Sequence, residues 1–348
     1  MLETKVPSIT DTLTGRGPAA PRILSGNSVI AEPLFNHQSI PFLIRPGAER
    51  VNLPAWAGTN LDFIESWLLH YGAILFRGFE ISGVEEFQAF AEATSSNGLL
   101  DYTFRSTPRK KVSGKIYTST EYPADQSIPL HNEMSYARNW PMKIWFYCLK
   151  PPARGGATTL ADSGRVLERI DPQVKTRFIR SGVRYVRNYR DGLDLSCREV
   201  FGTDDRSVIE RLCQEADIEC EFGGERQLRT RQTCQVIAVH PKARRAVWFN
   251  QAHLFHVSSL NPGVSKQLLA LYGEGGLPRN CYYSDGSSIN EADLHEIRAA
   301  YTRETVTFPW EEGDILMLDN MLVAHGRDPF AGERKVVVAM AEQYGISS

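Results

Sequence analysis

The chain has 348 residues, of which 42% are hydrophobic and 23% charged, as in an ordinary globular protein. The formal net charge of −2 leaves no basic excess to neutralise phosphates, so we expect no nucleic-acid or anionic-membrane partner. No apolar run approaches the roughly 20 residues needed to span a bilayer, and the N-terminus lacks the apolar segment of a secretory signal. The six cysteines form no CxxC pair, which favours reduced thiols in a cytoplasmic protein.

Residues 1–25 are polar and rich in Pro, Gly and Thr, which predicts a flexible N-terminal arm. Apolar spacing then predicts a helix over residues 61–71, begun by Asn60 and ended by Gly72. Further helices are expected at 82–92, where Ser82 and Glu85 form a capping box, and at 172–181, 208–215, 265–272 and 291–301.

Short β-branched or alternating runs predict strands in both halves of the chain, at 73–76, 115–118, 142–149, 233–239, 246–249, 304–308, 314–318 and 335–343. Because the helices fall mostly outside these strands, we expect an α+β fold that is mainly β, with one antiparallel core of jelly-roll type and flanking helices. Residues 26–348 then form a single domain. The charged stretch 183–231 is expected to be a helical and loop insertion between core strands.

His131 and Glu133 place an imidazole and a carboxylate two residues apart. On a strand, side chains two residues apart point to the same face and can grip one metal ion. The pair alone is a weak signal, because a single histidine is more often a satisfied core or surface residue. His325, expected on a loop at a strand end, adds a second imidazole. Two histidines and one carboxylate are the ligands of a non-haem Fe(II) site with open positions.

Arg334 opens the expected final strand, where a guanidinium near a metal would suit a carboxylate held bidentately. The alternative is a surface ion pair with Glu333 or Asp328. Arg327 has the same two readings, with Asp328 or Asp319 as the ion-pair partner.

Together these motifs carry a family resemblance. The order H-x-E, G-G-x-T, G-D-x-x-x-x-D-N-x-x-x-x-H-G-R-x-P-F and G-x-R resembles the Fe(II)/2-oxoglutarate dioxygenases. It is most similar to the taurine dioxygenase superfamily, in its clavaminate-synthase-like and syringomycin-biosynthesis-protein-like branch, to which Glu133 in place of the commoner aspartate points. The segments 117–124 and 247–253 are similar too, and the resemblance runs from about residue 60 to the C-terminus.

The resemblance implies a double-stranded β-helix (jelly-roll) core with Fe(II) bound by His131, Glu133 and His325. It also implies that Arg334 pairs with the distal carboxylate of 2-oxoglutarate and that Thr158 hydrogen-bonds the same cosubstrate. The keto acid chelates the iron and leaves one position for O2, and its decarboxylation to succinate and CO2 drives oxidation of an unactivated C–H bond. Because Glu133 fills the position that a halide would need, halogenation is disfavoured.

In this branch substrates are small molecules, either free amino acids or aminoacyl groups tethered to a carrier protein. Asn132, Met134 and Arg327 are candidates for substrate contact, although packing is the default for the first two. The arginines of 183–231 form either a solvated surface or a lid that recognises a carboxylate or a phosphopantetheine arm. The sequence leaves the oligomeric state open.

The leading function is therefore hydroxylation of an amino acid or carrier-tethered aminoacyl substrate in specialised-metabolite biosynthesis. The same oxidising chemistry can instead end in desaturation, cyclisation or epoxidation. Two other classes compete: a zinc-dependent hydrolase whose His₂Glu site activates water, and a non-catalytic jelly-roll binding module. Arg334 and Thr158 argue against the hydrolase, which needs no keto-acid clamp, and the intact triad argues against the binding module.

Overall fold

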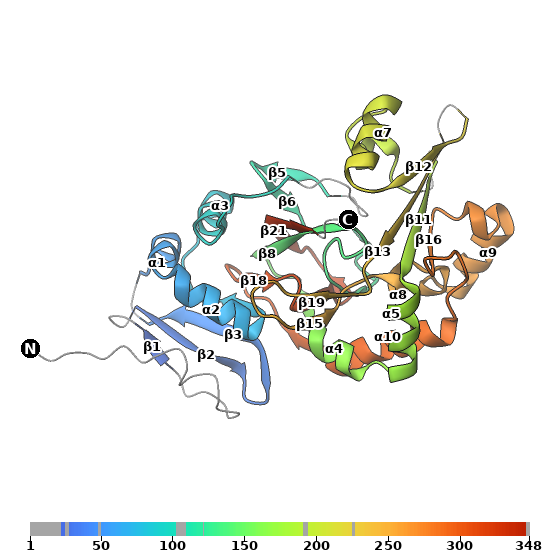
Figure 1. Cartoon of the computed structure of the whole chain (residues 1–348). Coiled ribbons are helices and arrows are strands. Elements are labelled where there is room, and N and C mark those ends of the chain that lie inside the picture. Colours follow the sequence, from blue (N-terminus) through green and yellow to red (C-terminus); the bar gives the residue numbers. More distant parts are fainter. Residues whose placement is uncertain are drawn as a thin grey trace, which may run out of the picture.

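The computed structural model describes residues 22–24, 28–47, 50–101, 109–120, 122–190, 194–224 and 227–345 (Figure 1). The expected N-terminal arm, residues 1–25, lies outside these ranges except for a three-residue strand. Within the described ranges, no helix is both long enough and apolar enough to cross a bilayer.

Two antiparallel sheets form the centre of the fold. The larger has nine strands, in the order β1 (Arg22–Leu24), β2 (Val29–Phe35), β3 (Gln38–Pro46), β4 (Ala73–Phe76), β18 (Ile315–Asp319), β8 (Asn139–Lys150), β21 (Lys335–Gly345), β6 (Ile116–Thr118) and β5 (Lys111–Ser113), with only β3 and β4 parallel. The smaller has four, in the order β17 (Val306–Phe308), β10 (Thr158–Asp162), β19 (Val323–Arg327) and β7 (Ile128–His131).

Alternation along β8 shows how the larger sheet is buried on both faces. Ile144 and Phe146 belong to the core shared with the smaller sheet, whereas Trp145 and Tyr147 belong to a second core beneath the N-terminal helices. Successive residues of a strand point to opposite faces, so one strand serves both cores. The two sheets and their common core confirm the predicted α+β fold, mainly β with flanking helices and a jelly-roll centre.

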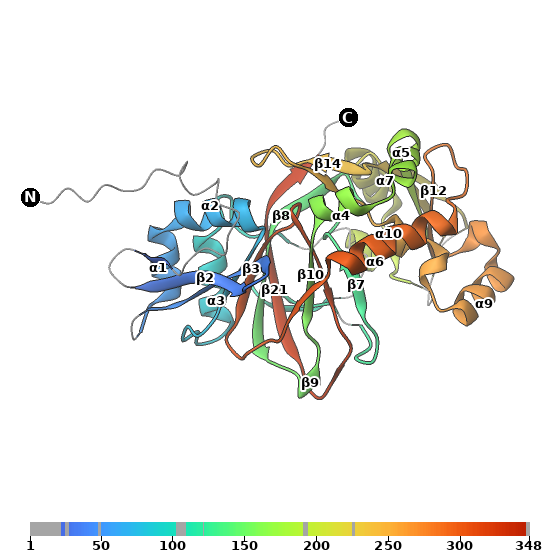
Figure 2. The ribbon, with the colours of Figure 1, turned by 90° about the horizontal axis from the view of Figure 1, so that it is seen from below.

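The helices α1 (Leu53–Thr59), α2 (Leu61–Tyr71) and α3 (Val84–Ala93), drawn in blue to teal in Figures 1 and 2, cover the outer face of the larger sheet. The predicted helix 61–71 is confirmed, and Gly72 ends it with a left-handed φ of 75°. Asn60 is the N-cap residue of this helix, as predicted, but its side chain makes no capping bond and donates instead to the Trp56 carbonyl. The predicted capping box of Ser82 and Glu85 was wrong, because Ser82 bonds Glu86 and the N-cap residue of α3 is Gly83.

The stretch 183–231 differs from the expected helices and loops. It does contain α6 (Cys197–Phe201) and α7 (Arg206–Glu215), but it also contributes to a third sheet of order β12 (Glu219–Phe222), β13 (Leu228–Cys234), β11 (Val183–Tyr189) and β16 (Arg279–Tyr282). Charged residues interrupt the apolar alternation of these strands, which hid them in the sequence. Several of the arginines bond local acids, as Arg231 does with Glu221.

The remaining elements connect and cover the sheets. They are α4 (Ser163–Arg169), α5 (Pro172–Ser181), α8 (Ala252–Phe255), α9 (Pro262–Tyr272), α10 (Glu291–Glu304), the 3-10 turns Val257–Ser259 and Glu274–Gly276, and the small ladders β14 (Ile237–Val239) with β15 (Ala246–Trp248) and β9 (Arg154–Gly155) with β20 (Phe330–Ala331). Helix α10 packs against β10, α4 and α8, on the side of the smaller sheet away from the N-terminal helices (Figure 2).

Candidate metal centre

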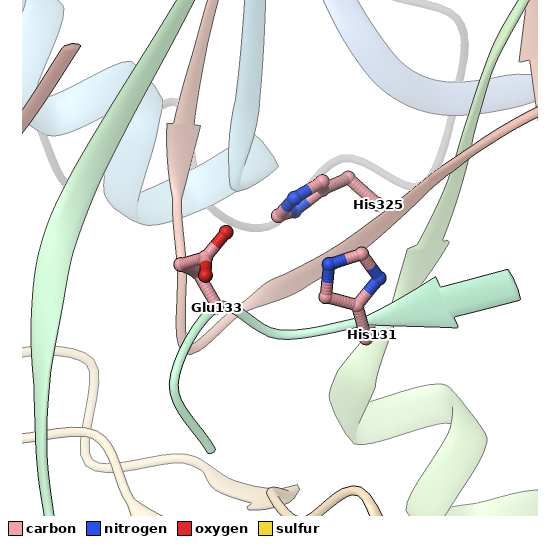
Figure 3. Close-up of side chains that lie close together, drawn as sticks. All are labelled: His131, Glu133 and His325. Carbon is pink, nitrogen blue, oxygen red and sulfur yellow. The ribbon is translucent and has the colours of Figure 1, made fainter. Parts of the chain in front are cut away.

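Two imidazoles and one carboxylate converge beside the smaller sheet. His131 ends β7 and His325 lies in β19, directly opposite it in the strand register, with the ring centroids 4.6 Å apart. Glu133 comes from the turn after β7. The three side chains point toward one another (Figure 3), and their ligand atoms all lie within 4.8 Å of one another. This arrangement can hold one metal ion from one side.

The local structure of two of these residues was predicted wrongly. β7 ends at His131, so Glu133 lies in a turn and not on a strand; the next residue, Met134, has a left-handed φ of 58°. Asn320 fixes this turn, because its Oδ1 accepts from Glu133 N at 2.7 Å and its Nδ2 donates to the Glu133 carbonyl at 2.9 Å. His325 lies within a strand and not on a loop at its end.

Hydrogen bonding and burial favour the neutral form of both imidazoles, which is the form that binds a metal. His131 Nδ1 lies 2.9 Å from the Pro129 carbonyl, which only accepts, so Nδ1 carries the proton and Nε2 keeps its lone pair for a metal. His325 Nδ1 is buried, with no hydrogen-bond partner among the described residues. Burial lowers the pKa of both histidines, and the nearby positive charge of Arg109 lowers it further. The donor set therefore fits a metal of the Fe(II) type.

An arginine that the sequence analysis missed completes the centre. Arg109 Nη2 lies 2.6 Å from Glu133 Oε2, and both side chains are buried. Arg109 precedes Glu133 by 24 residues, with no motif around it, so no local pattern marks it. Only the tertiary structure brings its guanidinium to the carboxylate.

A pocket next to the imidazoles contains both predicted cosubstrate residues. Thr158 and Arg334 line it together with His131, His325 and Arg327. Thr158 heads β10, and its Oγ1 accepts a hydrogen bond from Trp310 Nε1 at 2.9 Å. The structure therefore gathers both imidazoles and the two predicted cosubstrate residues around one space.

Arg334 is a partly buried cation in this pocket. No carboxylate of the described residues pairs with it, and its Nε donates only a long bond, 3.3 Å, to the Gly156 carbonyl. Glu333, the alternative partner, instead pairs with Lys150 at 2.6 Å. Burial, and then the neighbouring Arg327, lower the pKa of Arg334 to about 10. Taking a charge partly out of water is costly unless an opposite charge joins it.

The predicted substrate residues have structural contacts. Arg327 donates to the main-chain carbonyls of Tyr122, Pro123 and Gln126, and so holds the loop beyond β6 rather than pairing with Asp319 or Asp328. The Asn132 side chain is buried and donates to Ser163 Oγ and the Asn320 carbonyl. Met134 packs in the core between the sheets. Of the three, only Arg327 lines the pocket.

A jelly-roll core that brings two histidines and a carboxylate together, with a pocket beside the imidazoles that contains a partly buried arginine, is the arrangement of a non-haem metal oxygenase. The chain belongs to the TauD/TfdA family: residues 33–340 match the family described as "Taurine catabolism dioxygenase TauD, TfdA family". It is thus an Fe(II)/2-oxoglutarate-dependent dioxygenase of that family that acts on a small molecule, as predicted, and neither a zinc-dependent hydrolase nor a non-catalytic binding module.

Similar proteins cover nearly the whole chain. The dapdiamide synthesis protein DdaC of Enterobacter agglomerans is 41% identical over 311 residues, which are 86% of this chain and 94% of DdaC. A clavaminate synthase-like protein of Arabidopsis thaliana is 28% identical over 327 residues, 88% of this chain and 95% of its own. The solved structure of PvcB from Pseudomonas aeruginosa shares the fold with a TM-score of 0.54 at 15% identity, over 94% of both chains.

Proposed function

We propose that the chain hydroxylates an amino acid, free or tethered as an aminoacyl group to a carrier protein, in specialised-metabolite biosynthesis. The family supplies the oxygenase class, and the similarity to a dapdiamide synthesis protein favours a biosynthetic role. In this proposal His131, Glu133 and His325 hold Fe(II), and Thr158 and Arg334 hold the distal carboxylate of 2-oxoglutarate.

The partly buried guanidinium of Arg334 is the observation that supports the cosubstrate assignment most strongly. It lies in the same pocket as both imidazoles and pairs with no described carboxylate. A dicarboxylate that reaches from the metal to Arg334 would supply the missing anion, and its distal carboxylate would form two parallel hydrogen bonds with the guanidinium. Thr158 adds a hydroxyl donor, because Trp310 Nε1 already uses its oxygen as an acceptor.

Fe(II), when bound with 2-oxoglutarate and O2, supplies the oxidising power that removes hydrogen from a C–H bond while the cosubstrate becomes succinate. The protein residues bind and orient around that chemistry. Asn320 fixes the Glu133 main chain, and the Pro129 carbonyl fixes the His131 tautomer. The Phe146 ring, 5.1 Å from the His325 ring, is buried and shields that imidazole from water.

The way the substrate lies in the site decides between hydroxylation and its alternatives. Desaturation, cyclisation and epoxidation draw on the same oxidising chemistry, and the position of the substrate C–H or C=C bond selects among them. The carboxylate of Glu133 occupies the position that halide would need, so we do not expect a halogenated product.

A coupled assay tests this proposal. The Fe(II)-loaded enzyme is given 2-oxoglutarate and O2 with a panel of free amino acids, and in parallel with the same aminoacyl groups as carrier-protein or pantetheine thioesters. We expect succinate in amounts equal to an oxidised product whose mass has gained one oxygen atom. Succinate without any amino-acid or aminoacyl product across both panels would contradict the substrate class. A product that has lost two hydrogens would show desaturation or cyclisation in place of hydroxylation.

A further inference from the structure

Two side chains of one short segment hold the main chain on either side of His131. Gln251 Nε2 donates to the Asn132 carbonyl at 2.8 Å. His253 Nε2 lies 3.0 Å from the Leu130 carbonyl, which only accepts, so this nitrogen carries the proton and donates it. Leu130 and Asn132 directly precede and follow His131 in the chain, and the Gln251 and His253 side chains are both buried. The metal donor His131 therefore lies between two main-chain groups that are held from the start of α8.

The segment that carries Gln251 and His253 is itself held by two other parts of the fold. Gln251 N donates to the Tyr185 hydroxyl, on β11, at 2.7 Å. The His253 carbonyl accepts from Arg298 Nε, on α10, at 3.0 Å. The His253 ring also stacks on the ring of Tyr301, with the centroids 4.6 Å apart. The third sheet and α10 thus fix the position from which the two side chains reach β7.

The position of β7 in the sheet explains why it needs this support. In the part of the chain that the structure describes, β7 is the last strand of the smaller sheet and has only β19 beside it. The His131 ring bonds the Pro129 carbonyl, on its own strand, so the ring moves together with the main chain of β7. Hydrogen bonds to the neighbouring main-chain carbonyls therefore also limit the movement of His131 Nε2, the nitrogen that is left for a metal.

We propose that Gln251 and His253 are positioning residues that hold His131 in place for the metal, through the carbonyls of Asn132 and Leu130. The inference rests on the proposed function of the site. Both residues act through the main chain of β7, and neither belongs to the group of metal donors. A donor that is not held at its bonding distance binds a metal more weakly, so hydrogen bonds outside the ligands contribute to metal affinity.

A purely structural role for these two side chains predicts a different outcome when they are replaced. A buried carbonyl that loses its donor destabilises a fold wherever it lies, so a loss of stability alone would not show a role in the metal centre. If the bonds only satisfy buried groups, their removal leaves the metal affinity of the folded protein unchanged. If the bonds position His131, metal affinity falls and the coordination geometry changes with it.

Gln251→Met and His253→Phe, which remove one donor each, separate the two roles without any measurement of turnover. Co(II) is titrated into the metal-free protein, shown to be folded by circular dichroism, because its visible absorption bands report both occupancy and ligand geometry. We expect each variant to bind Co(II) at least about tenfold more weakly than wild type and with shifted bands. A loss of affinity smaller than about tenfold in either variant, or bands that coincide with those of wild type, would overturn the proposal.

Gln232→Met is the matched control for Gln251→Met. Gln232 is also buried, and its Nε2 also donates to a main-chain carbonyl, that of Ala216 at 2.7 Å, but it lies on β13 of the third sheet. The control should lower thermal stability and leave the affinity and the bands of Co(II) at their wild-type values. A loss of Co(II) affinity as large as that of Gln251→Met would show a general effect of lost stability and would count against the proposal.

Two milder variants test the donated hydrogen bonds themselves. His253→Gln keeps an N–H donor at about the reach of the imidazole Nε2, and we expect it to bind Co(II) within about threefold of wild type. A loss as large as that of His253→Phe would mean that this bond does not hold β7. Gln251→Asn keeps the amide on a side chain that is shorter by one CH₂ group. It takes the place of Gln251→Met if that variant does not fold, with the same expected loss.

The wild-type protein distinguishes failure of the inference from failure of the proposed function. If wild type binds neither Co(II) nor Fe(II), the proposed function fails. If wild type binds both metals and the Gln251 and His253 variants bind Co(II) equally well, only the role of these two residues is wrong.

Discussion

His131 and His325 lie directly opposite each other on the neighbouring antiparallel strands β7 and β19. Opposed residues of such a pair have Cβ atoms roughly 5 Å apart on the same face, which suits two ligands of one metal. A register slip of one residue would turn one imidazole to the other face. The geometry of the metal centre therefore depends on the pairing of β19 with β7. It also depends on the spacing of β19 from its two neighbours, β7 and β10.

Gly326 allows that close approach, and we predict that Gly326→Ala damages the metal centre. A Cβ at this position would lie 2.6 Å from both the Ile128 carbonyl oxygen and Thr159 Oγ1. The neighbouring strands must then move, which we expect to lower the free energy of unfolding by about 1–3 kcal/mol and to weaken metal binding. Calorimetric titration with Mn(II) measures the affinity. The control Gly275→Ala, where nothing lies within 4 Å, should change neither; equal Mn(II) affinity in both variants would contradict this account.

Asn320 should matter to the metal through the main chain of Glu133. Asn320→Ala removes hydrogen bonds to Glu133 N, to the Glu133 carbonyl and to the Pro141 carbonyl, all buried. Unsatisfied buried groups cost about 1–3 kcal/mol each, so we expect a large loss of stability together with weaker Mn(II) binding.

Asn188→Ala is the matched control, because the buried Asn188 side chain, on β11 of the third sheet, also donates to two main-chain carbonyls, those of Gly275 and Leu277. It should lower the denaturation midpoint and leave the Mn(II) affinity of the folded protein at the wild-type value. If Asn320→Ala showed this same pattern, Asn320 would have no role in the metal centre.

Thr158→Val tests the hydroxyl donor of the pocket. Trp310 Nε1 donates a hydrogen bond to Thr158 Oγ1, so the Thr158 hydroxyl can donate its own proton to a carboxylate. A hydrogen bond to a charged group contributes about 1.5–3 kcal/mol, so 2-oxoglutarate affinity should fall about tenfold or more while Fe(II) affinity stays the same. Thr159→Val, its neighbour on β10 outside the pocket lining, should leave 2-oxoglutarate affinity unchanged. Equal affinities in the two variants would remove Thr158 from the cosubstrate site.

Stability of the metal-free protein should fall as the solution is acidified. Burial lowers the pKa of His253 to about 3 from its ordinary value of 6.5. Below about pH 6.5 the His253 imidazole is protonated in the unfolded chain, whereas in the folded chain it stays neutral down to about pH 3. The free energy of unfolding therefore declines by about 1.4 kcal/mol per pH unit for this group across that window. Burial also lowers the pKa of His131 and His325, so these two groups add to the loss of stability on acidification.

His253→Phe isolates the contribution of His253. The substitution keeps an aromatic ring to stack on Tyr301, whose ring centroid lies 4.6 Å from that of His253, and it removes the titrating nitrogens. Urea denaturation of the chelator-treated protein at pH 7, 6 and 5, chosen to lie on both sides of about 6.5, should give a shallower pH slope for the variant. Identical slopes would show that another group carries the pH dependence.

The parts of the fold with strong local signals were predictable. The helix 61–71 has regular apolar spacing and a terminal glycine, and the structure reproduces its bounds. The stretch around Glu133 was not predictable in the same way. Its H-x-E pattern also fits a strand, and the hydrogen bonds that fix Glu133 in a turn come from Asn320, 187 residues away. The strands within 183–231 were missed because polar residues, such as Arg187 on β11 and Thr230 and Gln232 on β13, occupy buried positions that simple alternation assigns to apolar residues.

The contact of Arg109 with Glu133 could not be predicted from the sequence alone. Its partner Glu133 is 24 residues distant, and their contact depends on the pairing of β5, β6 and β21. No spacing rule connects residues on different sheets. The candidate metal donors are different, because a family motif marks each of them even though the chain separates them widely.

The most direct test of the central claim is an anaerobic titration of the metal-free protein with Fe(II) and then with 2-oxoglutarate, followed by the weak visible charge-transfer band of the chelate. We predict one Fe(II) and one 2-oxoglutarate bound per chain in wild type. We also predict that Arg334→Ala binds Fe(II) normally and 2-oxoglutarate at least about tenfold more weakly, because the variant loses the guanidinium that pairs with the distal carboxylate. A wild-type protein that retains zinc and develops no band would contradict the account. A variant that loses Fe(II) at unchanged cosubstrate affinity would show that Arg334 is misassigned.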